Sequence, residues 1–344
     1  MKKALKHISQ LFISWKGHSD FQTEVLPNSG SERKYVRIYH NDTTYMAAFN
    51  ENIAENKAFI DYTRQFQENH LPVPAIYIVA KDQLSYILED LGKLSLLQWV
   101  EMEKHQKDFE IKRIKLYQKV LTDLSGFQIT AGQNFDYRFA WPVKSFQKNA
   151  IIYDLNYFKK YFLENQKIKF DSHQLDNEFK LLASHLISTD THYFMYRDFQ
   201  ARNILLKDDK PYYIDYQGGR MGALQYDLAS LLYQAKAQLP EKIKLALLQF
   251  YVDHIQKRIP LNQDDFKQFF YSYALIRVLQ TVGAYGYRGL QQKKRHFIES
   301  IPLAINNLNA LKETAAILDN LPEIKDIISR IVLLKDQFEQ KSKQ

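Results

Sequence analysis

The feature that constrains the fold most is a change in hydrophobic periodicity near residue 92. Before this point, short runs rich in β-branched and aromatic residues are separated by turn residues, and one longer run repeats its apolar positions every three or four residues. The short runs predict strands and the longer pattern predicts a helix. The predicted strands are Phe21–Leu26, Tyr35–His40, Thr44–Phe49, Ala75–Ala80 and Ser85–Glu89, and the predicted helix is Ile53–Asn69.

After Asp90-Leu91-Gly92, long helical patterns dominate and two short strand-like runs interrupt them. The change predicts an α+β protein with a small antiparallel five-stranded lobe over residues 1–91 and a larger, mostly helical lobe over residues 92–344. The strand-like runs are Asn203–Lys207 and Pro211–Asp215; the helical ones are Leu94–Lys104, Glu110–Ala131, Leu155–Asn165, Leu175–Ser188, Asp227–Ala237, Glu241–Gln256, Phe266–Gly283, Pro302–Ile317 and Glu323–Lys341.

Composition excludes several classes of function. The 344 residues include no cysteine, which excludes disulfides, thiolate metal sites and cysteine nucleophiles. The net charge of +8 suits a phosphate-bearing ligand, and the Lys293-Lys294-Arg295 cluster lacks a nucleic-acid-binding pattern. No run approaches the ~18 apolar residues that would span a membrane, and the apolar spacing from Leu5 to Trp15 predicts an amphipathic helix instead of a signal sequence. We therefore expect a cytoplasmic protein with no nucleic-acid or membrane partner.

Three polar residues around the two later strands form the strongest candidate site. Asp198 follows an apolar run, Asn203 lies five positions on at a strand start, and Asp215 ends the next strand. We expect Asn203 and Asp215 to meet at one end of the hairpin, where their oxygens suit Mg²⁺. Asp198 is close enough to take a proton from a hydroxyl. This set favours phosphoryl transfer; the alternative interpretation is a structural hairpin with surface carboxylates.

The same segment resembles the catalytic segment of protein-kinase-like enzymes. Arg197-Asp198 and Asn203 match the R-D-x-x-x-x-N catalytic loop, and Ile214-Asp215-Tyr216-Gln217 takes the place of D-F-G. With Gly222, Tyr226-Asp227-Leu228 and Ser230-Leu231-Leu232, nearly the whole chain resembles the aminoglycoside phosphotransferase/choline kinase-like superfamily, and within it the bacterial anomeric kinases of N-acetylmuramate and N-acetylglucosamine.

The resemblance implies a protein-kinase-like bilobal fold that uses ATP and Mg²⁺. It implies a catalytic base at Asp198, metal ligands at Asn203 and Asp215, and structural support from Arg197, Arg202 and Asp227. Asp227 would lie at a helix start beneath the catalytic loop, where a carboxylate can bind backbone N–H groups.

Two departures from the family pattern stand out. Tyr196 replaces the catalytic-loop histidine, so the contact of that imidazole with nearby backbone is either lost or made by the phenol. No lysine occupies Thr44–Asn50, where related kinases keep the lysine that pairs with phosphates, although Glu55 matches its glutamate partner. Arg33, Lys34 or Arg37 could supply the positive charge, or all three could be solvated.

By resemblance, ATP lies between the lobes. Asn28, Ser29, Gly30, Ser31, Arg33 and Lys34 fall where the family has its phosphate-covering loop, and Glu89, Asp90 and Leu91 resemble the hinge whose backbone binds adenine. The single glycine of this loop and the lack of GxxxxGK[ST] exclude Rossmann and Walker sites. Because the backbone would bind the base, side chains leave little signature, and the choice between ATP and GTP stays open.

The acceptor candidates come from three segments. Gln200 neighbours the base, Tyr153-Asp154 opens a helix that the resemblance places near the acceptor, and a late helix with a glycine-rich end supplies Arg277, Gln280, Tyr285 and Arg288. Arg277 and Arg288 could bind a carboxylate such as a lactyl group. The alternative is that these arginines face water.

Three functions compete. The first is an ATP-dependent small-molecule kinase acting on a hydroxyl of an amino sugar. The second is an aminoglycoside phosphotransferase, whose polycationic acceptors suit this basic chain poorly. The third is a nucleotide-binding protein with weak or no kinase activity, suggested by Tyr196 and the missing lysine. A protein kinase is not favoured because no A-P-E segment follows Asp215. We expect the first function, because the base and both metal ligands are present.

Overall fold

The N-terminal part forms one antiparallel sheet in the computed structural model, which describes residues 1–27 and 32–343. The strands lie in the order β1-β2-β3-β5-β4. Each agrees with its predicted range to within one residue at either end, which confirms the five-stranded prediction. The strands are β1 (Gln22–Val25), β2 (Lys34–His40), β3 (Thr43–Phe49), β4 (Ile76–Val79) and β5 (Ser85–Glu89).

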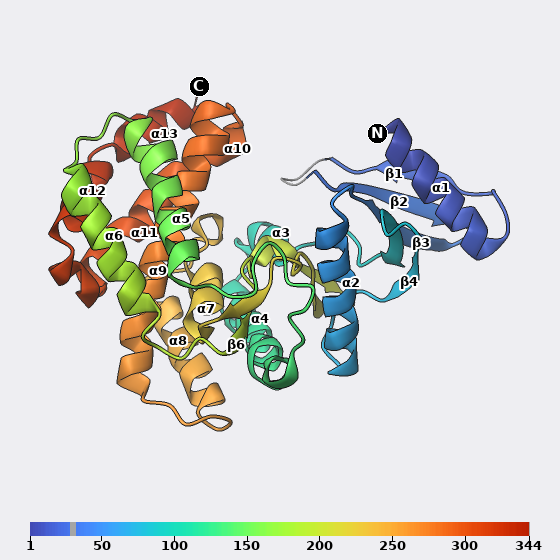
Figure 1. The fold of residues 1–344 in the computed structure, drawn as a ribbon, viewed down its shortest axis with the longest axis horizontal. Helices are drawn as coiled ribbons and strands as arrows, with labels where there is room; N and C mark the ends of the chain where they lie inside the picture. The colour runs from blue at the N-terminus through green and yellow to red at the C-terminus, as the bar shows by residue number, and fades with distance from the viewer. Residues whose placement is uncertain (28–31, 344) are drawn as a thin grey trace.

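Two helices cover the two faces of this sheet (Figure 1). The amphipathic helix α1 (Lys2–Lys16) buries Ile8 and Phe12 against Val36 of β2 in a small core of its own. On the other face, α2 (Ile53–Glu68) begins at Asn52, whose side chain accepts a hydrogen bond from the Glu55 amide. The core under α2 continues into the large lobe. The sheet is therefore held to the helical lobe by packing as well as by the chain connection.

The C-terminal part is mostly helical, as predicted. Two three-residue strands, β6 (Tyr193–Met195) and β9 (Arg220–Gly222), pair antiparallel and are too short to have been predicted from periodicity. The hairpin β7 (Ile204–Lys207) and β8 (Lys210–Tyr213) was predicted. The helices are α3 (Leu96–Glu103), α4 (Phe109–Ser125), α5 (Lys148–Phe158), α6 (Ser172–Leu186), α7 (Leu224–Leu232), α8 (Glu241–Ile255), α9 (Gln263–Tyr285), α10 (Arg295–Ile298), α11 (Ile301–Thr314), α12 (Pro322–Val332) and α13 (Lys335–Lys343).

Three predicted helices differ most from the structure in their bounds. The pattern Leu155–Asn165 misses the start of α5 at Lys148, because its first turn is polar. The predicted Asp227–Ala237 is α7, which begins at Leu224 and ends at Leu232; all its residues are buried, so no polar stripe marks its ends. The predicted Glu323–Lys341 is two helices, α12 and α13, whose buried Ile331 and Phe338 continue one apolar spacing across the break.

The glycine-rich end of α9 is explained by close packing. A Cβ on Gly286 would lie 2.2 Å from the carbonyl oxygen of Tyr161, and one on Gly283 would lie 2.8 Å from the Cα of Phe158. These glycines therefore let the C-terminal end of α9 pack closely against the backbone at the end of α5 and just beyond it.

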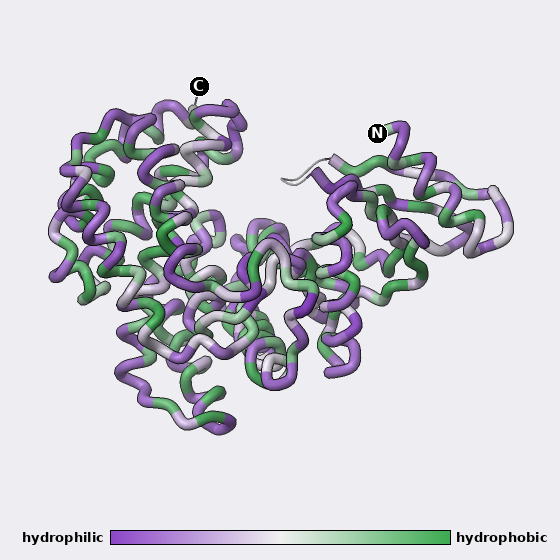
Figure 2. Tube along the Cα trace, viewed as in Figure 1, coloured by the Kyte–Doolittle hydropathy of each residue, from purple (hydrophilic) through white to green (hydrophobic). Residues whose placement is uncertain are grey.

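None of the helices described in residues 1–27 and 32–343 is both long and apolar enough to cross a membrane. In Figure 2, hydrophilic residues alternate with hydrophobic ones along the long helices, so none of these helices is continuously apolar.

Candidate active site

The loop that carries Asp198 is fixed from below by a buried carboxyl group. Asp227, in the first turn of α7, accepts hydrogen bonds from the backbone amides of Tyr196 (2.7 Å) and Arg197 (2.9 Å) and from the Gln128 side chain (3.1 Å). Its side chain is fully buried. Burial raises the pKa of Asp227 to about 7, although these three donors oppose the increase. The geometry expected from the sequence, a carboxyl beneath the loop, is present.

Arg197 holds the loop in a conformation that few non-glycine residues adopt. Its φ is 80°, in the left-handed region. Its backbone amide donates a hydrogen bond to Asp227. Its guanidinium donates two hydrogen bonds to the Asp154 carboxylate, at 2.7 and 2.9 Å. Strained backbone of this kind persists only where surrounding contacts define it. Asp154 is thus buried in an ion pair with Arg197.

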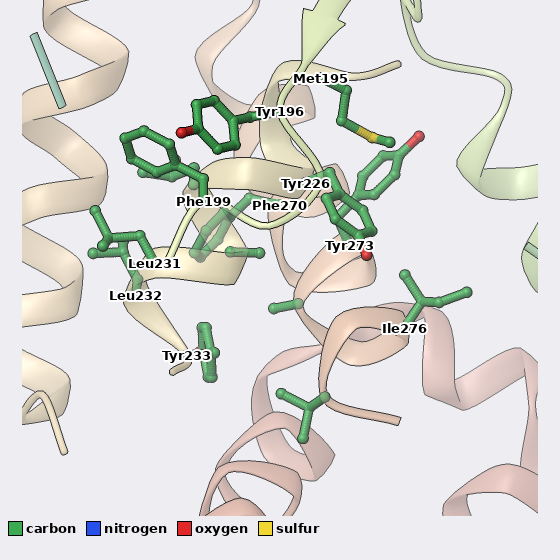
Figure 3. Packing of buried hydrophobic residues seen from close by; sticks show 14 of the residues in the cluster. Met195, Tyr196, Phe199, Tyr226, Leu231, Leu232, Tyr233, Phe270, Tyr273 and Ile276 are labelled. Atoms are coloured by element: carbon green, nitrogen blue, oxygen red, sulfur yellow. The ribbon is translucent and has the colours of Figure 1, made fainter. Parts of the chain in front are cut away.

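The phenol of Tyr196 makes the contact that the sequence left open. Its hydroxyl donates a 2.6 Å hydrogen bond to the carbonyl of Ile214, the residue before Asp215. Tyr196 and Phe199 lie against each other with ring centroids 5.1 Å apart, and both belong to the core shared with Tyr226 and Tyr273 (Figure 3). The loop and the Asp215 segment are therefore tied together across an aromatic core.

Asn203 and Asp215 are adjacent, at the same end of the β7–β8 hairpin. The Asn203 side-chain amide donates to the carbonyl of Asp198 (2.9 Å) and to Oδ2 of Asp215 (3.1 Å). Oδ1 of Asp215 accepts a 2.9 Å bond from Gln217. Within the described residues, no donor reaches Oδ1 of Asn203. One amide oxygen and one carboxylate at this spot fit the hard oxygen ligands that Mg²⁺ prefers.

Four arginines control the ionisation of Asp198. Burial alone would raise the pKa of this carboxyl, but positive charge outweighs it and holds the pKa below its ordinary value; the sources are Arg277, Arg197, Arg202 and Arg220. The side chain remains 45% exposed, and its nearest ion-pair partner is Arg277 at 3.5 Å. An ionised, accessible carboxylate is what a proton acceptor at neutral pH requires.

Asp215 has the opposite electrostatic environment. Burial, followed by the negative charge of Asp198, raises its pKa, while the hydrogen bond from Gln217 opposes the increase. Its φ of 72° is also in the left-handed region. A nearby cation would favour the charged form of this carboxyl, which agrees with the fit to a metal ion.

Arg33 is a predicted cation that pairs with Glu55. Its guanidinium donates a 2.9 Å bond to Glu55 on α2, in a pair whose side chains are only 1% and 10% exposed. The other oxygen of Glu55 accepts from Asn50 at 2.8 Å. Gln217 then bridges Glu55 (3.4 Å) and Asp215 (2.9 Å). A continuous polar path therefore joins Arg33 to Asp215.

The other two cationic candidates differ from Arg33. Arg37 makes two hydrogen bonds to Asp90 in the connection between lobes, at 2.6 and 3.1 Å. Lys34 is the first residue of β2. Residues Asn28, Ser29, Gly30 and Ser31 lie outside the described residues. Of the three predicted cations, Arg33 is the one that pairs with Glu55.

A cavity of about 440 Å³ lies between the sheet and the β7–β8 hairpin. Leu88, Leu205 and Ile214 line it, with Glu89, Asp90 and Leu91 along one edge and Asp215 at another. The Leu91 amide makes no hydrogen bond within the described residues and is therefore available to a ligand. An apolar slot with a free backbone donor and a carboxylate at one edge suits a nucleotide.

A second cavity, of about 350 Å³, opens beside the catalytic loop. Three of the expected acceptor residues line it: Gln200, Arg277 and Tyr285. Gln280 reaches it indirectly, because its side-chain oxygen accepts a hydrogen bond from Arg277.

The remaining predicted residues make other contacts in the structure. Asp154 pairs with Arg197, and Arg288 packs over Phe297 at 5.5 Å; neither lines the second cavity. Arg202, expected as internal support, has an exposed side chain on the cavity wall. The loop beyond β6 turns this side chain outward, away from the core.

Sequence reasoning missed four residues near the site. Gln217 was quoted only as part of a motif, and Arg220 lies two positions after Gly218 without any pattern that marks it. Lys236 and His296, on η5 (Ala235–Ala237) and α10, line the second cavity. They come from separate elements, so no spacing along the chain could have found them.

The fold and the placement of these groups define the class as a bilobal, protein-kinase-like phosphotransferase. The family model described as the phosphotransferase enzyme family matches residues 24–260, and the chain belongs to this family. It is therefore an enzyme that transfers a phosphoryl group to an alcohol.

Similar proteins agree with this class. An N-acetylmuramate/N-acetylglucosamine kinase of Neisseria meningitidis serogroup B is 23% identical over 250 residues, which cover 71% of this chain and 72% of the relative. The choline kinase LicA of Streptococcus pneumoniae has a similar structure, with a TM-score of 0.59 at 13% identity, covering 89% of this chain and 99% of that one. An ADP-bound aminoglycoside phosphotransferase, APH(2'')-Ib, has a TM-score of 0.56 at 14% identity, covering 90% and 96%. At such identities the structural likeness shows the fold alone.

Proposed function

We propose that the protein is an ATP- and Mg²⁺-dependent small-molecule kinase that transfers the γ-phosphoryl group to a hydroxyl of an amino sugar. The observation that carries the proposal is the ionised, accessible carboxylate of Asp198 beside the Asn203–Asp215 pair. Residues 1–91 would form the nucleotide-binding lobe and residues 92–344 the catalytic and acceptor-binding lobe. The relative's name supports an amino sugar. We place the reaction in the cytoplasm.

In this proposal each residue has one task. Asp198 orients the acceptor hydroxyl and takes its proton as the oxygen attacks the γ-phosphorus. Asn203 and Asp215 would hold Mg²⁺, which would neutralise phosphate charge. Arg33, paired with Glu55, supplies the positive charge that other kinases take from a strand lysine. The hinge amide of Leu91 would bind the base.

The polar residues below the loop position Asp198. Asp227 fixes the backbone on its N-terminal side through two amides, and Asn203 fixes its carbonyl. In phosphoryl transfer, positioning and charge neutralisation account for most of the rate enhancement. The catalytic carboxylate is thus held between two anchors while its own oxygens stay accessible.

The test is ADP release by purified protein with Mg·ATP and a panel of acceptors: N-acetylmuramate, N-acetylglucosamine, simple hexoses, choline and kanamycin. Turnover on an N-acetyl amino sugar supports the proposal. Turnover on kanamycin alone would assign an aminoglycoside phosphotransferase instead. ATP binding without turnover on any of these would favour the weakly active nucleotide-binding protein, and failure to bind ATP would refute the kinase function.

A further inference from the structure

The second cavity has a distinctive charge. Its basic residues come from four separate parts of the fold: Arg202 from the catalytic loop, Lys236 from η5, Arg277 from α9 and His296 from α10. No acidic side chain is among the residues that line it. A single solvated helix face would place like charges on one element. Here, three cations and a histidine from four elements converge on one hollow of about 350 Å³.

These charges are only weakly compensated. Neither Arg202 nor Lys236 forms an ion pair or side-chain hydrogen bond within residues 1–27 and 32–343. Arg277 is 7% exposed; it donates to Ser230 at 3.0 Å and to Thr281 at 3.2 Å, and it lies 3.5 Å from Asp198. Cations that approach one another without counter-ions repel, and an anion in the hollow would relieve this repulsion.

The pKa of His296 reports the same positive field. Burial lowers it first, and the charges of Lys236, Lys294 and Arg202 lower it further, whereas Glu299 alone opposes the change. The imidazole is therefore neutral at physiological pH, and its ring can accept or donate one hydrogen bond. Glu299 is itself paired with Arg295 at 3.1 Å, so it neutralises little of the field in the hollow.

We propose that this cavity binds the acceptor through an acidic group, a carboxylate or a phosphate, held by an anion subsite of Arg202, Lys236 and His296. The proposal rests on the kinase function above and names the class of its substrate. Arg277 lies between Asp198 and the cavity, so the reacting hydroxyl would lie at one end of the acceptor and the acidic group at the other. Tyr233, Tyr285 and Phe297 supply apolar walls that suit the faces of a sugar ring.

The matched test compares acceptors that share an amino-sugar ring and differ in charge. N-acetylmuramate carries a carboxylate, N-acetylglucosamine 6-phosphate carries a phosphate, and N-acetylglucosamine is neutral. At saturating Mg·ATP, we expect kcat/KM for at least one acidic acceptor to exceed that of the neutral one by about tenfold or more, as charge-assisted bonds to two cations require. The two acidic arms distinguish a carboxylate from a phosphate.

Two variants locate the effect. Lys236→Met and Arg202→Met should each lower the acidic-to-neutral ratio of kcat/KM toward one. Lys257→Met, which removes the same charge from an exposed position at the far end of α8, should leave the ratio as in the wild type. Raising salt from about 50 to about 500 mM should lower the ratio in the wild type, because screening weakens exposed charge pairs.

Calorimetry of N-acetylmuramate and N-acetylglucosamine binding, without turnover, separates this inference from the kinase proposal. Acid-selective binding that Lys236→Met abolishes would uphold the anion subsite even if no acceptor were phosphorylated. Equal or better binding and turnover of the neutral sugar would refute the subsite and leave the kinase function intact. Failure to bind either of these sugars, or N-acetylglucosamine 6-phosphate measured in the same way, would also refute it.

Discussion

Replacing Arg33 by methionine tests whether this residue supplies the cation that the β3 strand lacks. The substitution keeps a flexible side chain of similar length but strands Glu55 in a site where the two partners are 1% and 10% exposed. Breaking a buried ion pair costs about 3–5 kcal/mol. Glu55 keeps the amides of Asn50 at 2.8 Å and Gln217 at 3.4 Å. We therefore expect the lower end, a loss of about 3 kcal/mol in the free energy of unfolding.

The kinetic effect should be separate from the stability effect. A charge-assisted contact contributes about 1.5–3 kcal/mol. Because Arg33 is enclosed, we expect the lower value, which corresponds to a fall of about tenfold in kcat/KM for ATP. Glu55→Gln in the Arg33→Met background removes the stranded charge. It should restore most of the stability, measured by urea unfolding, and leave the kinetic defect.

The control is Arg64→Met, which removes an exposed arginine from α2, the helix that carries Glu55. It should change neither the unfolding free energy nor kcat/KM for ATP. A folded Arg33→Met protein with unchanged kcat/KM for ATP would show that Arg33 does not act on the nucleotide. An unfolding free energy unchanged to within about 0.5 kcal/mol would show that the Arg33–Glu55 pair is not buried as the structure has it.

Three further predictions concern the catalytic loop. Asp198→Asn should lower turnover by about 100-fold or more while the Kd for Mg·ATP stays near the wild-type value, because this change removes the base and not the metal ligands. Asp215→Ala should weaken Mg·ATP binding as well. Near-normal turnover of Asp198→Asn would refute the role assigned to Asp198. Tyr196→Phe should cost about 1–3 kcal/mol in urea unfolding, since it leaves the Ile214 carbonyl buried without its 2.6 Å donor; unchanged stability would contradict this. The folded pKa of Asp227, about 7, lies above its unfolded value, so the stability that this group contributes is complete below about pH 4 and is lost as pH rises through 7. The unfolding free energy of the wild type should therefore fall relative to that of Asp227→Asn by about 1.4 kcal/mol per pH unit between those limits. A difference between the two proteins that does not change with pH would refute the raised pKa.

The parts of the fold that sequence reasoning predicted are those with a local signal. The five N-terminal strands alternate between a face on α1 and a face on α2, so periodicity found each to within one residue. The ends of α7 were misplaced because every one of its residues is buried. The α12–α13 break was missed because Ile331 and Phe338 pack into one core and keep the helical spacing.

The candidate site divides in the same way. Asp198, Asn203 and Asp215 lie within eighteen positions on one loop and hairpin, so their spacing already predicted that Asn203 and Asp215 would meet. The second cavity has no such signal. Lys236 and His296 are separated by α8, α9 and their connections, and only the packing of α9 against its neighbours brings them to one hollow.

Arg33 also changes how the two halves of the site are connected. A lysine on β3 would stand in the middle of the sheet, whereas Arg33 directly precedes β2. Its pair with Glu55 (2.9 Å) continues through Gln217 (3.4 Å) to Asp215 (2.9 Å). The first two of these bonds are buried, so breaking either leaves a buried polar group unsatisfied at a cost of about 1–3 kcal/mol. A displacement of Arg33 is therefore coupled to the carboxylate expected to hold the metal, through side chains of both lobes.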